Sequence, residues 1–145
     1  MAIRSLCVMP HHTLRTVAAP IARFTEDVDR LIEDLIETMH AHHGVGLAAP
    51  QVGCGVQIFV ANPSQQRGEE LVVVNPVLEA SSGRTAVVEG CLSLPEVWEE
   101  VPRWASVRLR GQDASGAPVH IKAGGLLAIV IQHEVDHLKG RLVID

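Results

Sequence analysis

The chain has 145 residues and is 47% hydrophobic, 20% charged and 3% aromatic, which predicts one packed domain over residues 1–145 with a mostly aliphatic core. A net charge of −5, with lysine and arginine scattered along the chain, argues against direct binding of nucleic acid. The N-terminus lacks the pattern of a secretion signal and no apolar run is as long as a membrane span, so we expect a cytoplasmic protein without membrane contact.

The first predicted element is an amphipathic helix between residues 25 and 44. Apolar side chains recur at helical spacing from Val28 to Met39. Thr25 suits the N-cap position, and Gly44 is placed to end the helix.

Residues 44–53, GVGLAAPQVG, form a loop with little side-chain bulk in which Gln51 is the polar group. Alone, this stretch fits a tight turn packed against a sheet. Its glycine spacing is not G-x-G-x-x-G and it follows a helix, which excludes a dinucleotide-binding loop.

The middle of the chain changes to short runs rich in β-branched residues, separated by Asn-Pro, Ser-Ser-Gly and Asp-Ala-Ser-Gly turn signals. Successive strands with brief connections predict antiparallel sheets, because parallel pairs need longer crossovers. The predicted strands are residues 56–62, 70–76, 85–91, 106–111 and 118–123.

A second helix is predicted over residues 124–140, and its first half, Leu126 to Ile131, is apolar on every side. Such a helix is buried. The predicted fold class is therefore α+β, with antiparallel β-sheets around a buried metal-binding helix and the N-terminal helix packed outside.

The stretch HEVDH in this helix places His133 and His137 one turn apart, where both imidazoles can hold one ion, with Glu134 about 100° round the helix. A bare H-x-x-x-H fits solvated histidines at a helix end, but the apolar turns before this one favour a metal site. Catalytic sites commonly use three protein ligands, and Cys91 in EGCLSLP offers the third, beside Gly90 and Glu89.

The three cysteines are an odd number without framework spacing, which favours reduced thiols. Cys7 and Cys54 fit small buried hydrophobic residues. The histidines at residues 11 and 12 and those in HAHH at residues 40–43 lie outside the three motifs, and a second metal site there is disfavoured.

Taken in order, GVGLAAPQ, EGCLSLP and QHEVDH resemble the three signature motifs of the peptide deformylases, with a likeness that runs from about residue 3 to the C-terminus. The resemblance implies that Cys91, His133 and His137 hold one divalent ion per chain, naturally Fe(II), with zinc, nickel or cobalt also accepted. It implies hydrolysis of the N-terminal formyl group of formyl-methionyl peptides by a metal-bound hydroxide. Glu134 would be the general acid/base, and Gln51 and the Leu92 N–H would stabilise the oxyanion.

By the same resemblance, an apolar pocket beside the metal would accept the methionine side chain. The partners implied are formyl-methionyl N-termini of nascent proteins, with transient proximity to the ribosome, and we expect a monomer without the family's C-terminal helical extension. The residues expected to bind substrate are Val45, Gly46, Val87, Glu89, Leu126, Ile129 and Val130.

Trp98 departs from the family pattern, because a basic or polar residue is common at its position. With the short C-terminus, it leaves open a deformylase-like amidase acting on a different N-formyl or N-acyl substrate. A non-catalytic metal-binding paralogue would show damage at Glu134, Gln51 or a ligand, and none is seen. We also expect Asp136 and Arg103 to pair and orient the ligand-bearing helix.

Overall fold

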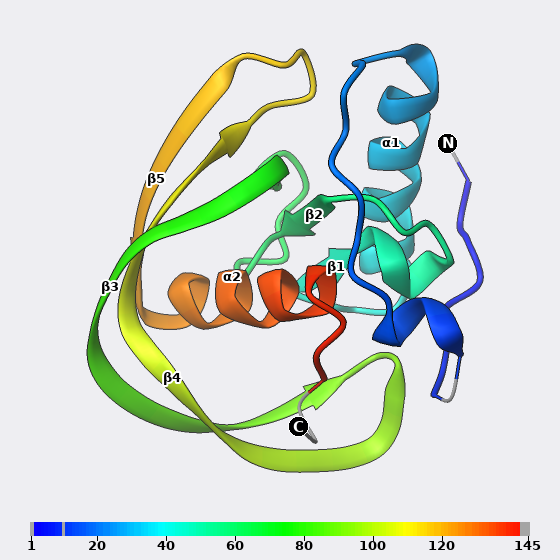
Figure 1. Ribbon diagram of the computed structural model, residues 1–145. Helices are drawn as coiled ribbons and strands as arrows, with labels where there is room; N and C mark the ends of the chain where they lie inside the picture. The colour runs from blue at the N-terminus through cyan, green and yellow to red at the C-terminus, as the bar shows by residue number, and fades with distance from the viewer. Residues whose placement is uncertain (1, 10, 143–145) are drawn as a thin grey trace.

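The structure is a computed structural model that describes residues 2–9 and 11–142, apart from the side chain of Glu96. Two helices and a strongly curved sheet make up its framework (Figure 1). The elements in chain order are the 3-10 helix η1 (His12–Arg15), α1 (Glu26–Ala41), β1 (Gly46–Ala48), the 3-10 helix η2 (Ala49–Val52), β2 (Ile58–Ala61), β3 (Leu71–Cys91), β4 (Leu94–Gln112), β5 (Pro118–Gly124) and α2 (Gly125–Leu138).

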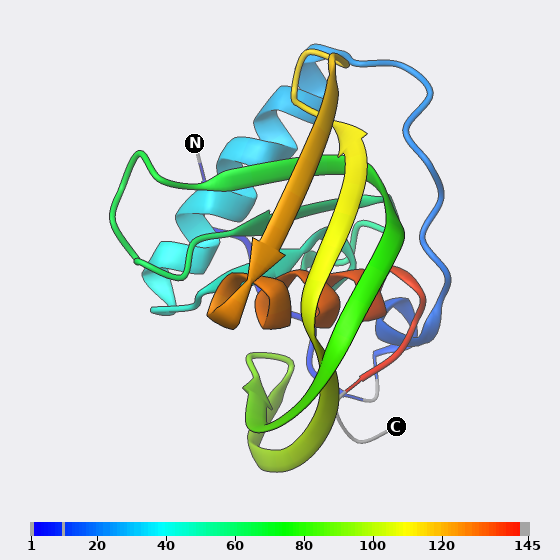
Figure 2. The same ribbon diagram turned by 90° about the vertical axis from the view of Figure 1, so that its left-hand side faces the viewer.

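The five strands form one antiparallel sheet in the order β1-β2-β3-β4-β5. Its long strands β3 and β4 wrap around α2, while α1 lies on the far side of β1 and β2 (Figures 1 and 2). The α+β class, the antiparallel pairing and the outer position of the first helix are as predicted. A single curved sheet stands where separate sheets were expected.

The strands predicted at residues 70–76 and 85–91 are parts of the one strand β3. The turn expected at Ser-Ser-Gly was wrong, because these residues pair with β4. Ser82 lies opposite Ser106, and their hydroxyl oxygens are 2.8 Å apart. Gly83 has a φ of 70° and lies within the strand, where it permits bending without ending the pairing.

The Asn-Pro signal likewise marks a bulge within β3 and not its end. The register of β3 with β4 shifts between Val74 and Val77, and Asn75 has a φ of 52°. Pro76 has no N–H to offer the ladder, and a bulge is one of the places where a strand tolerates it. The Asp-Ala-Ser-Gly signal does form the predicted turn, with the Asp113 carboxylate accepting the Ser115 N–H.

Thr25 occupies the N-cap position of α1, although its side chain makes no capping hydrogen bond. The helix ends at Ala41, before the predicted Gly44. His43 takes the left-handed conformation with a φ of 54°, and the Gly44 N–H donates to the Met39 carbonyl. Glycine was therefore not required for the left-handed turn itself.

Two apolar clusters form most of the core, and both are almost entirely aliphatic. One lies between α2 and the sheet, where Phe59 and Ile131 are fully buried, and the other lies between α1, β1 and β2 around Leu35 and Met39. Burial of α2 begins only at Ala128. The expectation that its first turn is buried was wrong, because Leu126 is 54% exposed at the edge of a cavity.

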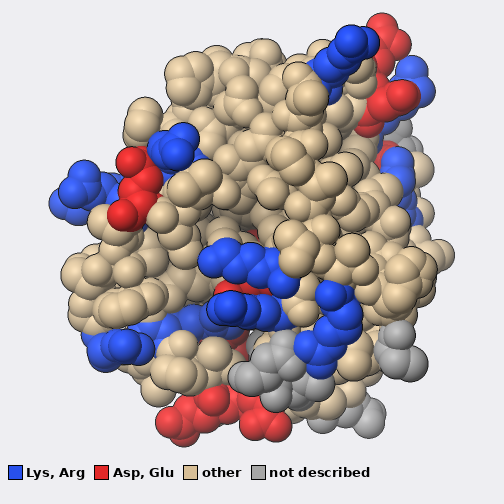
Figure 3. All heavy atoms as spheres, in the orientation of Figure 1, with Lys and Arg blue, Asp and Glu red and all other residues tan. Residues whose placement is uncertain are grey.

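Acidic and basic side chains are interspersed on the face shown in Figure 3, with broad uncharged areas between them. No helix of the described residues is long and apolar enough to cross a membrane. All three cysteines are free thiols, as predicted, although Cys7 and Cys54 are only half-buried.

Candidate active site

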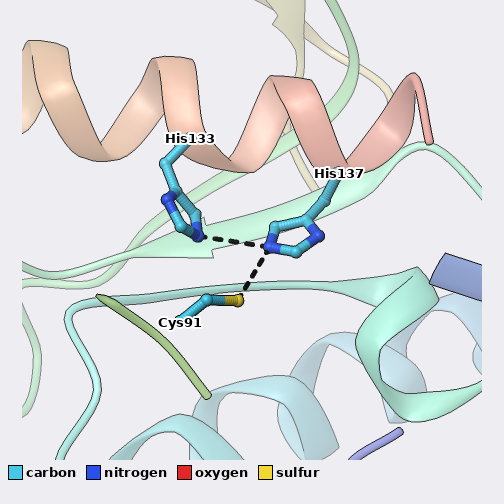
Figure 4. A group of neighbouring side chains, drawn as sticks. All are labelled: Cys91, His133 and His137. Atoms are coloured by element: carbon cyan, nitrogen blue, oxygen red, sulfur yellow. Dashed lines mark hydrogen bonds between the residues drawn. The ribbon is translucent and has the colours of Figure 1, made fainter. Parts of the chain in front are cut away.

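Cys91, His133 and His137 come together between the end of β3 and the second half of α2 (Figure 4). One ligand atom from each lies within 4.8 Å of the others, and no other such group of three occurs in the described residues. The His137 Nε2 lies 3.2 Å from the Cys91 Sγ and 3.2 Å from the His133 Nε2. The two histidines one helical turn apart and the cysteine far from them in the sequence therefore meet at one site.

These three residues fit a divalent transition metal. Ligand atoms arranged tetrahedrally at metal–ligand distances of about 2.0–2.3 Å lie roughly 3.4–3.6 Å from one another, close to the separations found here. A thiolate and two imidazoles are the donors that Fe(II), zinc, nickel and cobalt share. Three protein ligands leave one position open, which is typical of a catalytic centre.

Glu89 orients His133 for this task. Its Oε1 accepts the His133 Nδ1–H at 2.8 Å, which leaves the Nε2 lone pair of that ring directed at the cluster. Arg103 holds the same carboxylate from the other side, with Nε and Nη2 at 2.7 and 2.8 Å from its two oxygens. Its Nη1 also contacts Asp136 at 2.5 Å, so the predicted pair of Arg103 and Asp136 is present.

The charges of this network follow from its burial and pairing. Burial raises the pKa of Glu89, but its bonds to Arg103 and His133 outweigh that effect and lower the pKa to about 2. Burial lowers the pKa of His133, but the charge of Glu134 and the bonds to Cys91 and Glu89 raise it to about 10. Burial and the positive charge of His133 lower the pKa of His137 to about 3. A proton on the His133 Nε2 competes with a metal ion for that nitrogen.

Glu134 projects from α2 toward β1. It is fully enclosed, and burial raises the pKa of its carboxyl group to about 7. Among the described residues, its Oε1 is a buried oxygen without a hydrogen-bond partner. An unpaired carboxylate oxygen beside a metal-ligand set is available to hold and move a proton.

Gln51 reaches the site from η2. Its carbonyl oxygen accepts the Ala48 N–H at 3.0 Å, and this contact turns the amide group toward the metal ligands. The Nε2 lies 3.2 Å from the Ser93 Oγ and 3.6 Å from the Cys91 Sγ. Leu92 follows Cys91 at the turn between β3 and β4 and lines the same cavity.

The group opens into a cavity of about 390 Å³. Val87 does not line it, because this residue lies two positions, about 7 Å, up the strand from Glu89. Glu89 is at the wall, but both its oxygens are bound to Arg103 or His133. The residues expected to bind substrate that do line the cavity are Val45, Gly46, Glu89, Leu126, Ile129 and Val130.

Another cavity lies between β4 and the far side of α2, with a volume of about 490 Å³. Arg103, Asp136 and Lys139 are among its lining residues. It contains neither Glu134 nor any of the three ligands, so its larger size does not make it the reaction site.

Sequence reasoning missed the N-terminal segment as a support of the site. The Cys7 N–H donates to the Gln51 carbonyl at 2.6 Å, and the Met9 N–H donates to the Ser93 carbonyl at 3.1 Å. These backbone contacts hold the two stretches that carry the amide donor and its hydroxyl partner. Backbone contacts leave no residue-type signature, but the serine within EGCLSLP could have been singled out as a polar residue beside Cys91.

The model of a protein family described as polypeptide deformylase matches residues 3–145 of this chain. A peptide deformylase from Legionella pneumophila is 40% identical, with a TM-score of 0.97 over 99% of this chain and 85% of that one. A peptide deformylase from Thermotoga maritima is 36% identical, with a TM-score of 0.95 over 100% of this chain and 97% of that one.

A third similar structure is a peptide deformylase from Synechococcus elongatus in complex with actinonin. It is 36% identical, with a TM-score of 0.92 over 98% of this chain and 77% of that one. The likeness therefore spans nearly the whole chain in both sequence and fold.

Proposed function

The chain belongs to the peptide deformylase family, and on that premise we propose that it removes the formyl group from formyl-methionyl N-termini of nascent proteins. The observation that carries the proposal is the meeting of Cys91, His133 and His137 with Glu134 and Gln51 at one cavity. Residues 1–145 act as one deformylase-like domain. The amidase alternative gains no support from the similar structures, which are themselves peptide deformylases.

Cys91, His133 and His137 hold one divalent ion, and Fe(II) is the proposed natural metal. Such an ion lowers the pKa of a water molecule bound to it and polarises a carbonyl oxygen. Glu89 and Arg103 keep the His133 ring in the orientation that this binding requires.

Glu134 accepts a proton from the attacking water and returns it to the amine that leaves. Two features support this role: its buried Oε1 has no partner among the described residues, and its pKa of about 7 suits proton transfer near neutral pH. The Gln51 Nε2 and the Leu92 N–H donate to the formyl oxygen as negative charge develops on it.

The methionine side chain occupies the apolar part of the cavity, against Val45, Ile129 and Val130. We further propose that the protein acts as a cytoplasmic monomer with transient access to the ribosome, where formylated N-termini emerge. These partners follow from the substrate and not from a separate docking surface.

The test is formate release from a formyl-Met peptide by protein loaded anaerobically with Fe(II) or Ni(II). Glu134→Gln should reduce kcat roughly 100- to 10,000-fold, because a positioned acid/base typically contributes that much. Its metal content should stay at one ion per chain, since Glu134 is not a ligand. Glu100→Gln, at an exposed glutamate on β4, is the matched control and should retain the wild-type rate.

Absence of formate release by the fully loaded wild-type protein would contradict the proposal. Loss of metal from Glu134→Gln would contradict the role assigned to this residue. Metal analysis must therefore accompany each rate.

A further inference from the structure

Two large apolar side chains are exposed at the mouth of the catalytic cavity. Trp98 is 69% exposed and Leu126 is 54% exposed, and both line the cavity. The other large hydrophobic residues exposed in the described part of the chain line neither this cavity nor the one behind α2; they are Ile3, Val8, Val17, Val77 and Val88. Two of the seven exposed large hydrophobic residues in the described part of the chain therefore lie at one cavity, where a ligand enters.

The indole of Trp98 rests against a glycine that leaves room for it. Gly90 and Trp98 are opposite one another in the pairing of β3 with β4. A Cβ at Gly90 would lie 2.6 Å from Cζ3 and 2.8 Å from Cε3 of the ring, so any larger residue would push the indole away. The ring is thus seated on the backbone next to Cys91 before a substrate arrives, which reduces the entropy lost on binding.

Leu126 belongs to the first turn of α2, and Trp98 belongs to the β3–β4 hairpin. Figure 2 shows this hairpin beneath α2, and the cavity is lined by residues from both elements. The described lining includes no lysine or arginine, and its two carboxylates belong to Glu89 and Glu134. The described residues of the mouth therefore offer apolar area and an aromatic face to the peptide.

We propose that Trp98 and Leu126 select substrates with a bulky apolar side chain at the second or third residue of the peptide, counting the formyl-methionine as the first. This inference rests on the proposed function, because a methionine held within the cavity directs the following residues out through its mouth. An extended peptide advances about 3.3 Å per residue, which brings the second or third side chain to the indole. Contact between an aromatic side chain and the indole adds stabilisation beyond the area that it buries.

The test compares kcat/KM for three formyl peptides of equal length: formyl-Met-Ala-Ala-Ala and its variants with Phe at residue two or residue three. The wild-type protein should favour one Phe peptide by roughly 3- to 10-fold, the size expected of one aromatic pair, and the difference should lie in KM. Trp98→Ala should bring the ratio close to 1, Leu126→Ala should reduce it, and Trp98→Phe should keep most of it.

Val88→Ala is the matched control, because Val88 is 65% exposed on β3 and does not line the cavity. It should keep the wild-type ratio. A second readout is tryptophan fluorescence in the Glu134→Gln protein: the Phe peptide should shift the emission, and the shift should disappear in Glu134→Gln combined with Trp98→Phe.

The inference would be overturned if Trp98→Ala released formate from all three peptides at the wild-type rates and the peptides caused no change in fluorescence. The proposed function would still stand. A preference of the wild-type protein for formyl-Met-Ala-Ala-Ala over both Phe peptides would overturn the assignment to a bulky apolar side chain. Failure of the metal-loaded wild-type protein on every peptide would instead refute the proposed function, and the fluorescence shift would then decide whether Trp98 binds peptide.

Discussion

Gly46 lacks a side chain at the point where the Glu134 carboxylate, the proposed acid/base, is placed. A Cβ at this residue would lie 2.5 Å from Oε2 of Glu134 and 2.7 Å from Cγ1 of Val130. An alanine would therefore have to displace both the Glu134 carboxylate and the Val130 side chain, which is β-branched and has little rotamer freedom in a helix. The substitution should therefore damage the reaction and the fold together.

We expect Gly46→Ala to lower kcat roughly 10- to 100-fold, because a displacement of about 1 Å at a catalytic group can cost that much. The free energy of unfolding should fall by about 1–3 kcal/mol through overpacking. Gly55→Ala is the control, since nothing lies within 4 Å of a Cβ there. Formate release and urea unfolding measure the two effects, and a wild-type rate in Gly46→Ala would show that the carboxylate does not need this position.

At the scale of elements, the side chain of Gln132 joins α2 to the backbone of β4. Beyond the last pair of β4 with β5, Ser106 and Gly124, the edge of β4 continues without a strand partner. Gln132 takes that place: its Oε1 accepts the Trp104 N–H at 2.8 Å and its Nε2 donates to the Trp104 carbonyl at 2.8 Å. The helix that carries His133 and His137 is thereby joined to the sheet through both backbone groups of Trp104.

Gln132→Leu should reduce the free energy of unfolding by about 1–3 kcal/mol, because the Trp104 N–H and carbonyl lose their partner while the new side chain has a similar size. Urea denaturation followed by circular dichroism measures the change. Gln66→Leu, at an exposed glutamine, should change the free energy of unfolding by less than about 0.5 kcal/mol. Equal effects of the two substitutions would remove the special role of Gln132.

Over the whole molecule, buried and half-buried carboxylates join segments that lie far apart in the sequence. Asp34 on α1 accepts the Ala2 N–H at 2.8 Å and pairs with Arg4 at 2.8 Å. Glu70, before β3, lies 2.9 Å from the His40 Nε2 at the end of α1. The N-terminal segment that Asp34 holds also contacts the Gln51 loop, so the ion pair supports the site indirectly.

These contacts make stability depend on pH. Burial raises the pKa of Asp34, but the bonds from Arg4 and from the Ala2 N–H, together with the positive charge of Arg4, outweigh burial and lower the pKa from its usual value. Because the folded-state pKa is depressed, the stabilisation is complete above the unfolded value and is lost as pH falls through the folded value. The free energy of unfolding of the metal-free protein should therefore decline below about pH 4.

Asp34→Asn should lower stability at pH 7 and make it less dependent on pH below 4, as measured by urea unfolding across that range. Glu33→Gln, at an exposed acid in the same helix, is the comparison and should keep the wild-type slope. A wild-type slope in Asp34→Asn would assign the acid sensitivity to other carboxylates.

The sequence by itself predicted much of the site, because its motifs depend on local spacing. A four-residue interval on a helix places His133 and His137 on one face whatever surrounds them, and the need for a third ligand pointed to Cys91 in EGCLSLP. The resemblance added the roles of Glu134 and Gln51. The two helices and the antiparallel pairing were also predictable, since hydrophobic periodicity and short connections are local signals. The family followed from the order of three motifs.

Only the tertiary structure decided how the strands run and what surrounds the site. Ser-Ser-Gly and Asn-Pro predict turns in isolation, but pairing with β4 keeps both inside one long strand. Strand register places Trp98 against Gly90. The packing of distant segments brings Gln132 to Trp104 and the Cys7 N–H to the Gln51 carbonyl. Such contacts join residues far apart in sequence, and no local pattern of residue types specifies them.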